Sequence, residues 1–544
     1  MSDTPAQSDL AQSNMAQGNM AQNIPAASMP AEEPKLSVGL YIGYLAMVLG
    51  LFMAILDIQI VSSSISEIQA GLSASADEIS WVQTSYLIAE VIMIPFSGYL
   101  SRLLSTRILF TLSAFSFTIA SVGCAMSNNL ESMIVMRALQ GFLGGAMIPT
   151  VFATVFIMFP PRKRAAASVT IGLIATLAPT IGPTLGGYLT QWMSWHWLFL
   201  INVVPGIVVC VLVWVFLDID KPNLGLLRGF DYLGLAAMAV FLGSLEYVIE
   251  EGPRHDWLSE PIIRNFAIAC AIGGLIFFWR CLTHKNPAVD LKAFRNRNFA
   301  SGCVYSFTLG IGLYGLVYLL PLFLARVRGL NSLQIGEIMF VTGLSQFLIA
   351  PLAGFLARNA DPRKVLLFGL FLLAASTWSM GNITGDWQFD ELLLPQIMRG
   401  AALMLCMVPI NAIALGTLPP HEVKNAAGLY NLTRNLGGAF GLAAINSVLI
   451  ERNAHHWNRL IEAINPGRPE VQAYIDGVAT SLAEKLQTDE TMVAAKLLAA
   501  KVTQQASIMS FADCFFLMTI LFSCATLGVM LAKRPQMQGG GGAH

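Results

Sequence analysis

Five ionisable residues interrupt long apolar stretches of this 544-residue chain: Asp57, Glu90, Arg137, Arg399 and Arg434. A charge at the centre of a bilayer costs about 3 kcal/mol on insertion scales, so such residues are functional candidates by default. A carboxylate beside an arginine can bind and release a proton as its surroundings change, which is the chemistry that proton-coupled transport needs. The five residues therefore predict a proton relay inside a membrane, provided that the surrounding stretches span one.

Asp57 and Arg137 form the most promising pair, because their positions place them at similar depth. At a rise of 1.5 Å per residue, Asp57 lies about 25 Å from the cytoplasmic start of its helix and Arg137 about 10 Å from the outer start of its own, in a hydrocarbon core about 30 Å thick. We favour coupling over a structural ion pair for these two. For Glu90, near mid-membrane, both roles are equally open, and for Arg399 and Arg434 we expect contacts with helix ends, carbonyls or neighbouring domains.

The composition indicates that those stretches do span a membrane. Hydrophobic residues make up 55% of the chain and charged residues 12%, with a mean hydropathy of +0.62, whereas a soluble globular protein is about a quarter charged. The net charge of -1 leaves no surplus of Lys and Arg for nucleic-acid binding. A bilayer needs roughly twenty apolar residues per helix, which predicts fourteen spans at 40–64, 80–101, 108–126, 131–157, 167–189, 197–217, 232–250, 262–282, 298–324, 333–357, 363–381, 391–417, 424–450 and 509–532.

The distribution of basic residues predicts the orientation. Short cytoplasmic loops are enriched in Lys and Arg, and a cytoplasmic N-terminus assigns most of the 32 such residues to that side. The short outer loops then hold only Arg254, Arg264, Arg326 and Arg328. With an even number of spans, both termini are expected to be cytoplasmic.

An internal repeat predicts two related halves. The pattern Pro95-x-x-Gly98-x-Leu-x-Arg102 returns as Pro351-x-x-Gly354-x-Leu-x-Arg358, and Met136-Arg137 with Pro160-Pro161 returns as Met398-Arg399 with Pro419-Pro420. Repeated halves that rock about a midplane site are the architecture of many secondary transporters. We expect an all-α membrane protein with a disordered tail (1–38), a six-helix bundle (39–217), an inserted two-helix hairpin with connectors (218–297), a second six-helix bundle (298–533) that includes a long outer loop (451–508), and a C-terminal tail (534–544).

Other chemistry is not indicated. The eight cysteines lie in or beside apolar runs without a CxxC pair, so they are expected to be small core residues. The sequence has no HExxH, GxSxG or phosphate-binding loop, which disfavours an enzyme, a sensor or an ATP-driven pump. His455-His456 lacks further nearby ligands, so we expect a solvated loop there and no metal site. Protons are the coupling ion we expect, with no other cofactor.

Several motifs stand in the expected spans. Span one ends Leu56-Asp57-Ile-Gln-Ile-Val61, and span four carries Arg137-Ala-Leu-Gln140-Gly141. Span five carries Gly172, Pro179, Gly182, Pro183, Gly186 and Gly187, and is followed by Trp195-His-Trp-Leu-Phe-Leu-Ile-Asn202-Val-Val-Pro205. These motifs resemble the major facilitator superfamily, and within it the fourteen-span drug:proton antiporters typified by EmrB and QacA. The likeness covers nearly the whole chain beyond its N-terminal tail.

The resemblance implies the major facilitator fold and proton-coupled efflux of lipophilic or amphiphilic compounds across the plasma membrane, which is the inner membrane of a Gram-negative cell. It adds weight to Asp57 and Arg137 as coupling residues, whereas Glu90 lies outside its motifs. The Gly and Pro residues of span five would form a hinge or a seal against leakage, or would simply allow close helix packing. A dedicated exporter of a siderophore or a fatty acid on the same scaffold is the alternative.

The loop after span two departs from this family, because the usual Gly-x-x-x-Asp-Arg is replaced by Gly98-Tyr-Leu-Ser-Arg102-Leu103. The missing aspartate puts a charge latch at this loop in doubt. The long outer segment 451–508 is a second distinctive feature, and its Ala-rich part from Val478 to Ala506 predicts a helix or hairpin that projects from the membrane. The resemblance implies contact there with an EmrA-like adaptor leading to a TolC-like outer-membrane channel, and a simple cap over the outer vestibule is an equal alternative.

Overall fold

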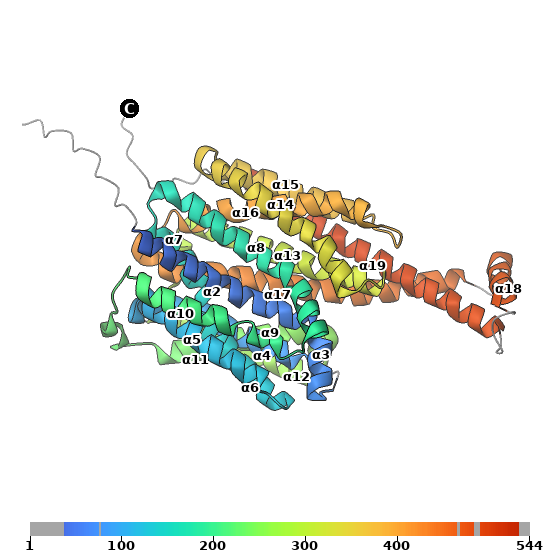
Figure 1. The fold of residues 1–544 in the computed structure, drawn as a ribbon, viewed down its shortest axis with the longest axis horizontal. Helices are drawn as coiled ribbons and strands as arrows, with labels where there is room; N and C mark the ends of the chain where they lie inside the picture. The colour runs from blue at the N-terminus through green and yellow to red at the C-terminus, as the bar shows by residue number, and fades with distance from the viewer. Residues whose placement is uncertain (1–36, 76–77, 285, 465–467, 483–489, 532–544) are drawn as a thin grey trace, which may run out of the picture. The chain divides into compact units, whose positions relative to one another are not determined.

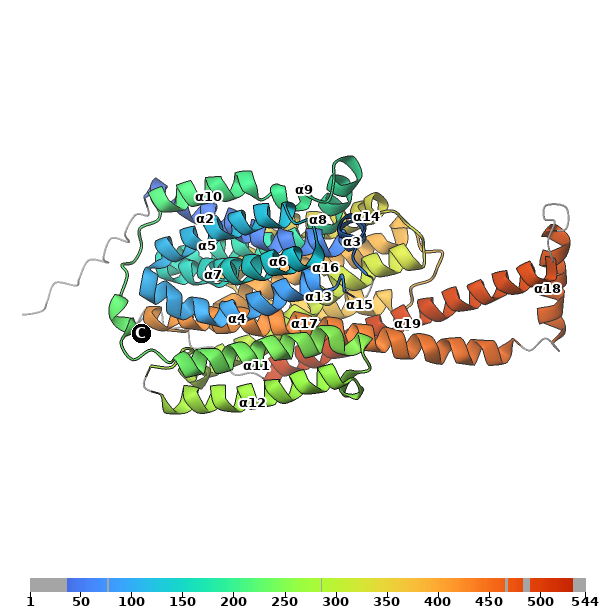
Figure 2. The same cartoon turned by 90° about the horizontal axis from the view of Figure 1, so that it is seen from below.

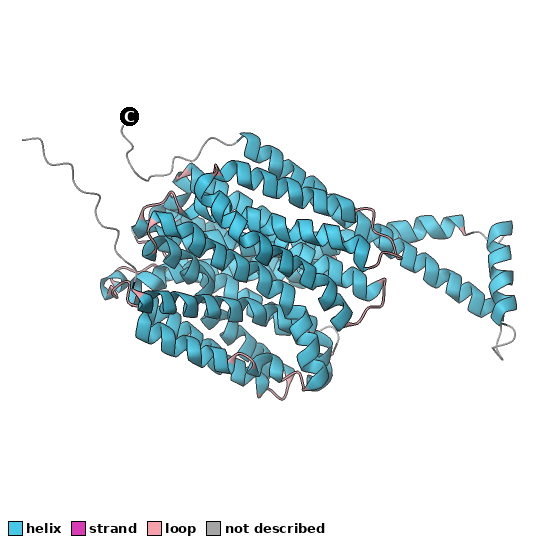
Figure 3. Ribbon diagram, turned by 45° about the horizontal axis from the view of Figure 1, so that its top comes forward, coloured by secondary structure: helices cyan, strands magenta, loops and turns pink. Residues whose placement is uncertain are grey.

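The computed structural model describes residues 37–75, 78–284, 286–464, 468–482 and 490–531. The chain divides into Met1–Ser37 and Val38–His544, and the description below concerns the second unit. Every regular element among the described residues is a helix (Figure 3). Of the expected tails 1–38 and 534–544, only Ser37 and Val38 fall within the described residues.

The helices follow one another along the chain in three groups (Figure 1). The N-terminal half contains α2 (Val38–Ser63), α3 (Ile65–Leu72), α4 (Trp81–Leu104), α5 (Thr106–Ala125), α6 (Leu130–Gly144), α7 (Met147–Met158), α8 (Pro161–Trp192), α9 (Trp197–Leu200) and α10 (Val203–Phe216). The middle segment contains η1 (Leu224–Leu227), α11 (Tyr232–Glu251), η2 (Gly252–Arg254), η3 (Trp257–Ser259), α12 (Pro261–Thr283) and η4 (Leu291–Arg295). The C-terminal half contains α13 (Arg297–Arg326), α14 (Ser332–Asn359), α15 (Pro362–Met380), α16 (Phe389–Leu415), α17 (Pro420–Ala463), α18 (Pro469–Leu482) and α19 (Glu490–Leu531).

Among the described residues, 13 segments are long and apolar enough to cross a membrane. The expected span 424–450 is not one of them, because it carries Lys424, Asn425, Asn431 and Arg434 along part of α17. α17 nevertheless packs against α13, α4 and α19. It therefore takes the place of the fourteenth crossing helix, and its polar residues are sheltered by neighbouring helices and not by lipid.

The two halves share the positions of their prolines and the helices through which they contact each other. Pro95 lies inside α4 and Pro351 inside α14, while α8 and α17 both begin directly after a proline, at Pro161 and Pro420. A proline in the first turn loses no helical hydrogen bond, so it marks a helix start. Across the halves, α4 packs against α17 and α8 packs against α14. These equivalent pairings indicate two related bundles that meet through two matching helix contacts.

The middle segment forms a helical hairpin. α11 and α12 pack against each other, and α11 also contacts α4 and α17. Its attachment is partly polar, since Thr84 Oγ1 donates to Glu251 Oε1 at 3.1 Å and the rings of Trp81 and Tyr247 stack with 5.3 Å between their centroids. Only 17% of the apolar window of α12 is buried within the protein, against 44% for α11. The hairpin thus presents α12 outward and α11 to both halves.

The segment 451–508 is largely helical in its described parts. α17 continues to Ala463 and α19 begins at Glu490, and both run past the other helices to meet α18 (Figures 1 and 2). Within the expected helical stretch Val478–Ala506, α18 ends at Leu482 and α19 follows, while residues 483–489 lie outside the described ones. We call residues 451–463, α18 and residues 490–508 the arms.

The expectation that His455 and His456 lie in a solvated loop is wrong, because both are helical residues at the base of the arms. His455 and His456 lie within α17, and His456 is buried. His456 Nε2 lies 2.7 Å from Asp513 Oδ2, which also accepts from Arg452 Nε at 2.5 Å. The histidine therefore helps to tie α17 to α19.

Candidate functional site: a buried ion pair and a cavity between the halves

The interior of the N-terminal half holds an ion pair between Asp57 of α2 and Arg137 of α6. Arg137 Nη1 donates to Asp57 Oδ2 at 2.6 Å, and both side chains are fully buried. Removing two charges from water is costly, so a buried pair persists only where close contact and further hydrogen bonds offset that cost. The structure thus brings together the two residues that the sequence had placed at matching depth.

Two amides complete the coordination of the Asp57 carboxylate. Gln140 Nε2 donates to Oδ1 at 3.0 Å, and Asn202 Nδ2 donates to the same oxygen at 2.7 Å. Gln140 also accepts from Arg137 Nη1 and donates to Ser121 Oγ, both at 2.6 Å. The carboxylate therefore accepts three hydrogen bonds from α6 and from the start of α10. Gln140 and Asn202 stand in the sequence motifs but had been given no role, and no sequence signal singled out Ser121.

Arg137 is held from the α4 side as well. Its Nε donates to the Val82 carbonyl at 3.1 Å, and its guanidinium carbon lies 4.2 Å from the centre of the Tyr86 ring. Gly141, one turn further along α6, allows this approach, because a Cβ atom there would lie 2.3 Å from the Tyr86 carbonyl oxygen. The ion pair is therefore positioned by α2, α4, α6 and α10 together.

A cavity of about 490 Å³ lies between the two halves, and Glu90 of α4 lines it. The Glu90 side chain is 2% exposed, and its Oε1 has no hydrogen-bond partner among the described residues. Asp57 does not line the cavity, although its neighbours Ile58 and Gln59 do. The two expected coupling carboxylates are thus in different settings. Asp57 is hydrogen-bonded behind the cavity lining, whereas Glu90 lies in the lining with one oxygen that has no partner among the described residues.

Two further carboxylates, Glu246 and Glu250 of α11, line the same cavity. They are four residues apart, which places them on one face of the helix. Both fall inside the expected span 232–250, so the rule that singled out Glu90 applied equally to them, but the sequence analysis had not included them. Tyr314 and Tyr318 of α13 line the cavity from the C-terminal half with their aromatic rings.

Arg399 and Arg434 lie in the C-terminal half, and neither forms an ion pair within the described residues. Arg399 Nη1 donates to the Leu316 carbonyl at 3.1 Å. Arg434 Nη2 donates to Asn431 Oδ1 at 2.7 Å, and its guanidinium carbon lies 4.8 Å from the ring centre of Phe152 in the other half. Arg434 therefore contacts both halves, whereas Arg399 stays within its own.

The glycine and proline residues of the antiporter-like motif all lie in α8, which continues unbroken through Pro179 and Pro183. α8 packs against α2 and α14. A Cβ atom on Gly182 would lie 2.4 Å from the Cβ of Gln59 in α2, and one on Gly172 would lie 3.3 Å from Met407 Cγ in α16. Pro183 itself lines the cavity. The motif is thus closely packed at Gly172 and Gly182, and Gly186 and Gly187 follow toward the end of α8.

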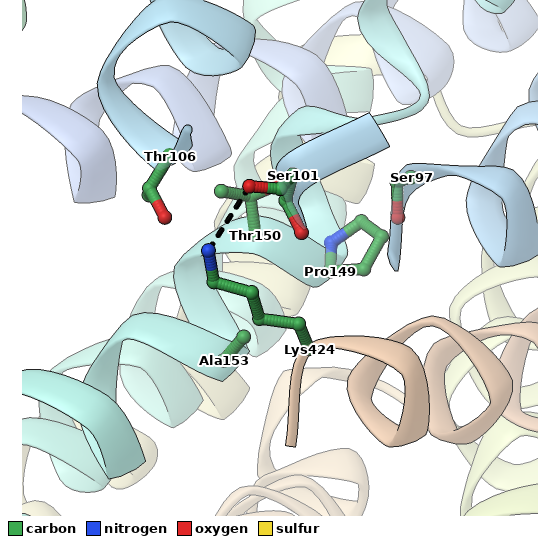
Figure 4. Close-up of a pocket in the computed structure, with 7 residues that line it drawn as sticks. All are labelled: Ser97, Ser101, Thr106, Pro149, Thr150, Ala153 and Lys424. Atoms are coloured by element: carbon green, nitrogen blue, oxygen red, sulfur yellow. Dashed lines mark hydrogen bonds between the residues drawn. The ribbon is translucent and has the colours of Figure 1, made fainter. Parts of the chain in front are cut away.

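At the start of α17, the end of that helix opposite to the arms, a polar junction joins the halves, and Figure 4 shows its Lys424 beside Ser101. Lys424 of α17 donates to the Ser101 carbonyl at 3.0 Å and forms an ion pair with Asp220, which follows α10. Asp220 Oδ1 also accepts from the backbone N–H of Thr106 at 2.9 Å. A crevice lined by Ser97, Ser101, Thr106, Pro149, Thr150, Ala153 and Lys424 marks this junction, but it encloses essentially no volume. We call Ser101, Asp220 and Lys424 the latch.

Comparison with known proteins decides the family. The profile of the Major Facilitator Superfamily matches residues 47–442. The chain belongs to this superfamily. Three curated transporters also align with it along most of their length. The chain is 43% identical over 491 residues to the colistin resistance protein EmrB of Acinetobacter baumannii, covering 90% of this chain and 96% of that protein.

More distant relatives agree with this assignment. Identity is 31% over 519 residues with the multidrug export protein EmrB of Escherichia coli K12, covering 94% of this transporter and 99% of the relative. It is 29% over 499 residues with the fatty acid resistance protein FarB of Neisseria gonorrhoeae, covering 92% and 97%. The transporter is therefore EmrB-like and belongs with the drug:proton antiporters of the superfamily.

Solved structures show the same fold. The human organic anion transporter MFSD10 superposes with a TM-score of 0.56 at 14% identity, covering 90% of this transporter and all of that chain. Together with the apolar helices, the family establishes a multi-pass integral protein of the plasma membrane, which is the inner membrane in a Gram-negative cell. In many transporters built from two repeats the substrate site lies at the interface between the repeats, and the cavity between the halves occupies such an interface.

Proposed function

We propose that this transporter exports lipophilic and amphiphilic compounds by alternating access, in exchange for protons. The observation that carries the proposal is the cavity between the halves. Its wall combines apolar side chains, two tyrosines and a carboxylate oxygen that has no hydrogen-bond partner in the described part of the chain. Binding pockets for small molecules are mostly apolar with a few placed polar groups. Relatives named for multidrug export and for colistin resistance support an efflux role for such a pocket.

Protons are the coupling ion in this proposal, and no other cofactor is invoked. Asp57, with three donors, holds its negative charge while α6 and the start of α10 remain in place. A rearrangement that withdrew both Arg137 and the amides would leave the carboxylate without donors inside the membrane, where it would take up a proton. Glu90 responds directly to what enters the cavity. Together, Asp57, Arg137 and Glu90 would link proton binding to the access state.

Alternating access requires that the contacts between the halves open and close in turn. α8 supplies the motif strip of glycines and prolines on one side of the cavity, and Pro179 and Pro183 each remove one helical hydrogen bond. Such a helix can bend without breaking. We assign α8 the role of hinge and seal, with Gly172, Gly182, Gly186 and Gly187 allowing the close packing that blocks leakage.

The basic residues favour a topology with both termini in the cytoplasm, which places the latch at the cytoplasmic end and the arms outside. In a cell with two membranes, the arms would contact an EmrA-like periplasmic adaptor that leads to a TolC-like outer-membrane channel. Their length beyond the other helices supports this proposal (Figure 2).

A dedicated exporter of a physiological metabolite is the second candidate function. The similarity to a fatty acid resistance protein favours it, because that relative covers nearly the whole transporter. The relative at 43% identity is named for antibiotic resistance, however, and the cavity is large and acidic. These two observations favour amphiphilic drugs as the main substrates.

Uptake into everted membrane vesicles tests the proposal. An imposed pH gradient should drive accumulation of a lipophilic dye, and a protonophore should abolish it. Vesicles without the transporter provide the background. Accumulation that is indifferent to the gradient would reject proton antiport, and absence of accumulation for every amphiphile tried would favour the dedicated exporter.

A further inference from the structure

The inserted hairpin forms part of the cavity wall. α11 packs against α4 in the N-terminal half and against α17 in the C-terminal half, and its residues Glu246, Ile249 and Glu250 line the cavity. The hairpin therefore has more than a scaffolding position, because removing it would open the cavity on one side.

The charges at this wall are strongly unequal. Among the described lining residues, the carboxylates are Glu90, Glu246 and Glu250, and the only cation is Arg254. The Arg254 side chain is mostly exposed and lies 3.8 Å from Glu251, which does not line the cavity. Arg254 is thus shared with a carboxylate outside the cavity, and the three lining carboxylates outnumber the one lining cation.

An independent observation indicates that a ligand fills this gap. Glu90 is 98% buried, and its Oε1, at the cavity wall, has no hydrogen-bond partner among the described residues. A buried carboxylate oxygen without a donor is costly, so such groups usually have a partner that the protein itself does not supply. Tyr314 and Tyr318 line the same cavity, and their ring faces attract cations.

We propose that the cavity binds an organic cation, and that Glu246 and Glu250 of the inserted hairpin are the residues that select for its charge. The proposal rests on the proposed export function and narrows its substrate class. Apolar lining residues such as Leu87, Val91 and Ile249 accommodate the hydrophobic part of the ligand, while the carboxylates of α11 and Glu90 approach its positive centre from two helices. A neutral amphiphile meets the same apolar surface without the electrostatic attraction.

The neighbouring residue provides a matched control. Glu251 is also a buried carboxylate of α11, but it accepts from Thr84 at 3.1 Å and lies outside the cavity lining. Glu251→Gln keeps an acceptor for Thr84 and removes one charge from the same helix, that of the carboxylate 3.8 Å from the mostly exposed Arg254. It therefore separates a general effect of charge on α11 from a specific effect at the cavity.

The experiment uses the purified full chain, with tetraphenylphosphonium as the cation and phenylnaphthylamine as the neutral lipophilic probe. Glu246→Gln and Glu250→Gln should each weaken tetraphenylphosphonium binding by on the order of tenfold, and the double variant by more. For these variants the ratio of tetraphenylphosphonium affinity to neutral-probe affinity should fall by on the order of tenfold. Gradient-driven transport of the neutral probe in proteoliposomes should remain measurable, and Glu251→Gln should retain native binding of both probes.

The outcomes separate this proposal from the general export function. If the native chain transports the neutral probe but does not bind tetraphenylphosphonium, or if both glutamate variants bind it with native affinity, the cation site is wrong and the export function stands. If the native chain transports neither probe, the export function itself fails. A variant that does not fold would lose binding of the neutral probe as well as of the cation. In that case the other single glutamate variant, and the comparison of the two probes on the native chain, test the cation site.

Discussion

Lys424 near the start of α17 forms an ion pair with Asp220 of the connector after α10, so charge ties the C-terminal half to the segment that leaves the N-terminal half. The loop after α4 lacks the aspartate that is usual in this family, and the sequence therefore put a charge latch there in doubt. The structure shows a charged contact at this end all the same, because the carboxylate comes from a different segment. Asp220 also anchors the start of α5 through Thr106.

Asp220→Asn should weaken the latch. The ammonium group of Lys424 is mostly buried and would lose its charged partner, which costs about 1–3 kcal/mol. Conformations that separate α4 from α17 then become more populated, and amide hydrogen exchange should accelerate in residues 98–106 and 424–430. Asp218→Asn is the control, because Asp218 is 76% exposed and lies 4.0 Å from Arg107. Identical exchange in native and Asp220→Asn proteins would show that the pair does not hold this end closed.

Asp57→Asn should end pH-driven export while leaving the protein folded. Asparagine fits the same space and can still bond to Gln140 and Asn202, but it cannot gain or lose a proton. Arg137→Ala should weaken coupling, because it removes the guanidinium that holds the carboxylate charged. The measurements are proton release on substrate addition in detergent and gradient-driven transport in vesicles.

Glu131→Gln serves as the control for these variants, because Glu131 is exposed at the first turn of α6. It should export and release protons as the native protein does. Normal proton release and transport by Asp57→Asn would move the coupling role to Glu90 or elsewhere.

Glu90→Gln should change substrate preference more than the rate of neutral-drug export. Its carboxylate lines the cavity, so neutralising it removes an attraction for cations and leaves the apolar surface intact. We expect the ratio of initial export rates, cation over neutral probe, to fall by on the order of tenfold. Glu90→Asp keeps the charge and should retain most of the ratio. Equal losses for both probes would mean that Glu90 does not discriminate between substrates by their charge.

Gly141→Ala should destabilise the contact between α4 and α6. The added methyl group would lie 2.3 Å from a backbone carbonyl oxygen, which cannot move aside without shifting a helix. Such overpacking costs about 1–3 kcal/mol, and thermal unfolding in detergent should show a lower midpoint. Gly477→Ala in α18 is the comparison, since nothing lies within 4 Å of its added atom. A native midpoint for Gly141→Ala would mean that the two helices are not in close contact.

Replacing residues 460–500 by a short Gly-Ser linker removes α18 and the tips of the arms. Transport into everted vesicles should persist, because the cavity and ion pair lie elsewhere. Resistance of intact cells and co-purification of a periplasmic adaptor should both be lost. Full resistance with unchanged co-purification would eliminate the arms as the adaptor-binding element.

Much of this architecture is visible in the sequence, because a bilayer imposes strong rules on composition. The requirement for apolar runs located nearly every crossing helix, and matched depth together with the family motifs paired Asp57 with Arg137 across 80 positions. Glu246 and Glu250 lie in an apolar span, as Glu90 does, so the rule that a charge inside such a span is a functional candidate also applies to them. The sequence analysis did not predict a role for them, because the hairpin matches neither half of the internal repeat.

Other features depend on packing that no local pattern encodes. Asp220 lies in an ordinary polar connector, and its partner lies 204 positions away, so only the folded chain reveals the latch. The hydrogen bonds that Gln140 and Asn202 donate to Asp57 likewise come from the crossing of three helices. The sequence identified their motifs, but hydrogen-bond geometry assigned their role.

α17 carries Lys424 near its start, Asn435, Gly438 and Ala439 along the cavity wall, and His456 at the base of the arms. With 44 residues it is about 66 Å long at 1.5 Å per residue. A helix of that length would act as a lever if it tilted as a unit: a tilt of about 10° about Lys424 would move the far tip by about 10 Å. Release of one ion pair at one end of the helix would thereby become a large displacement at the other.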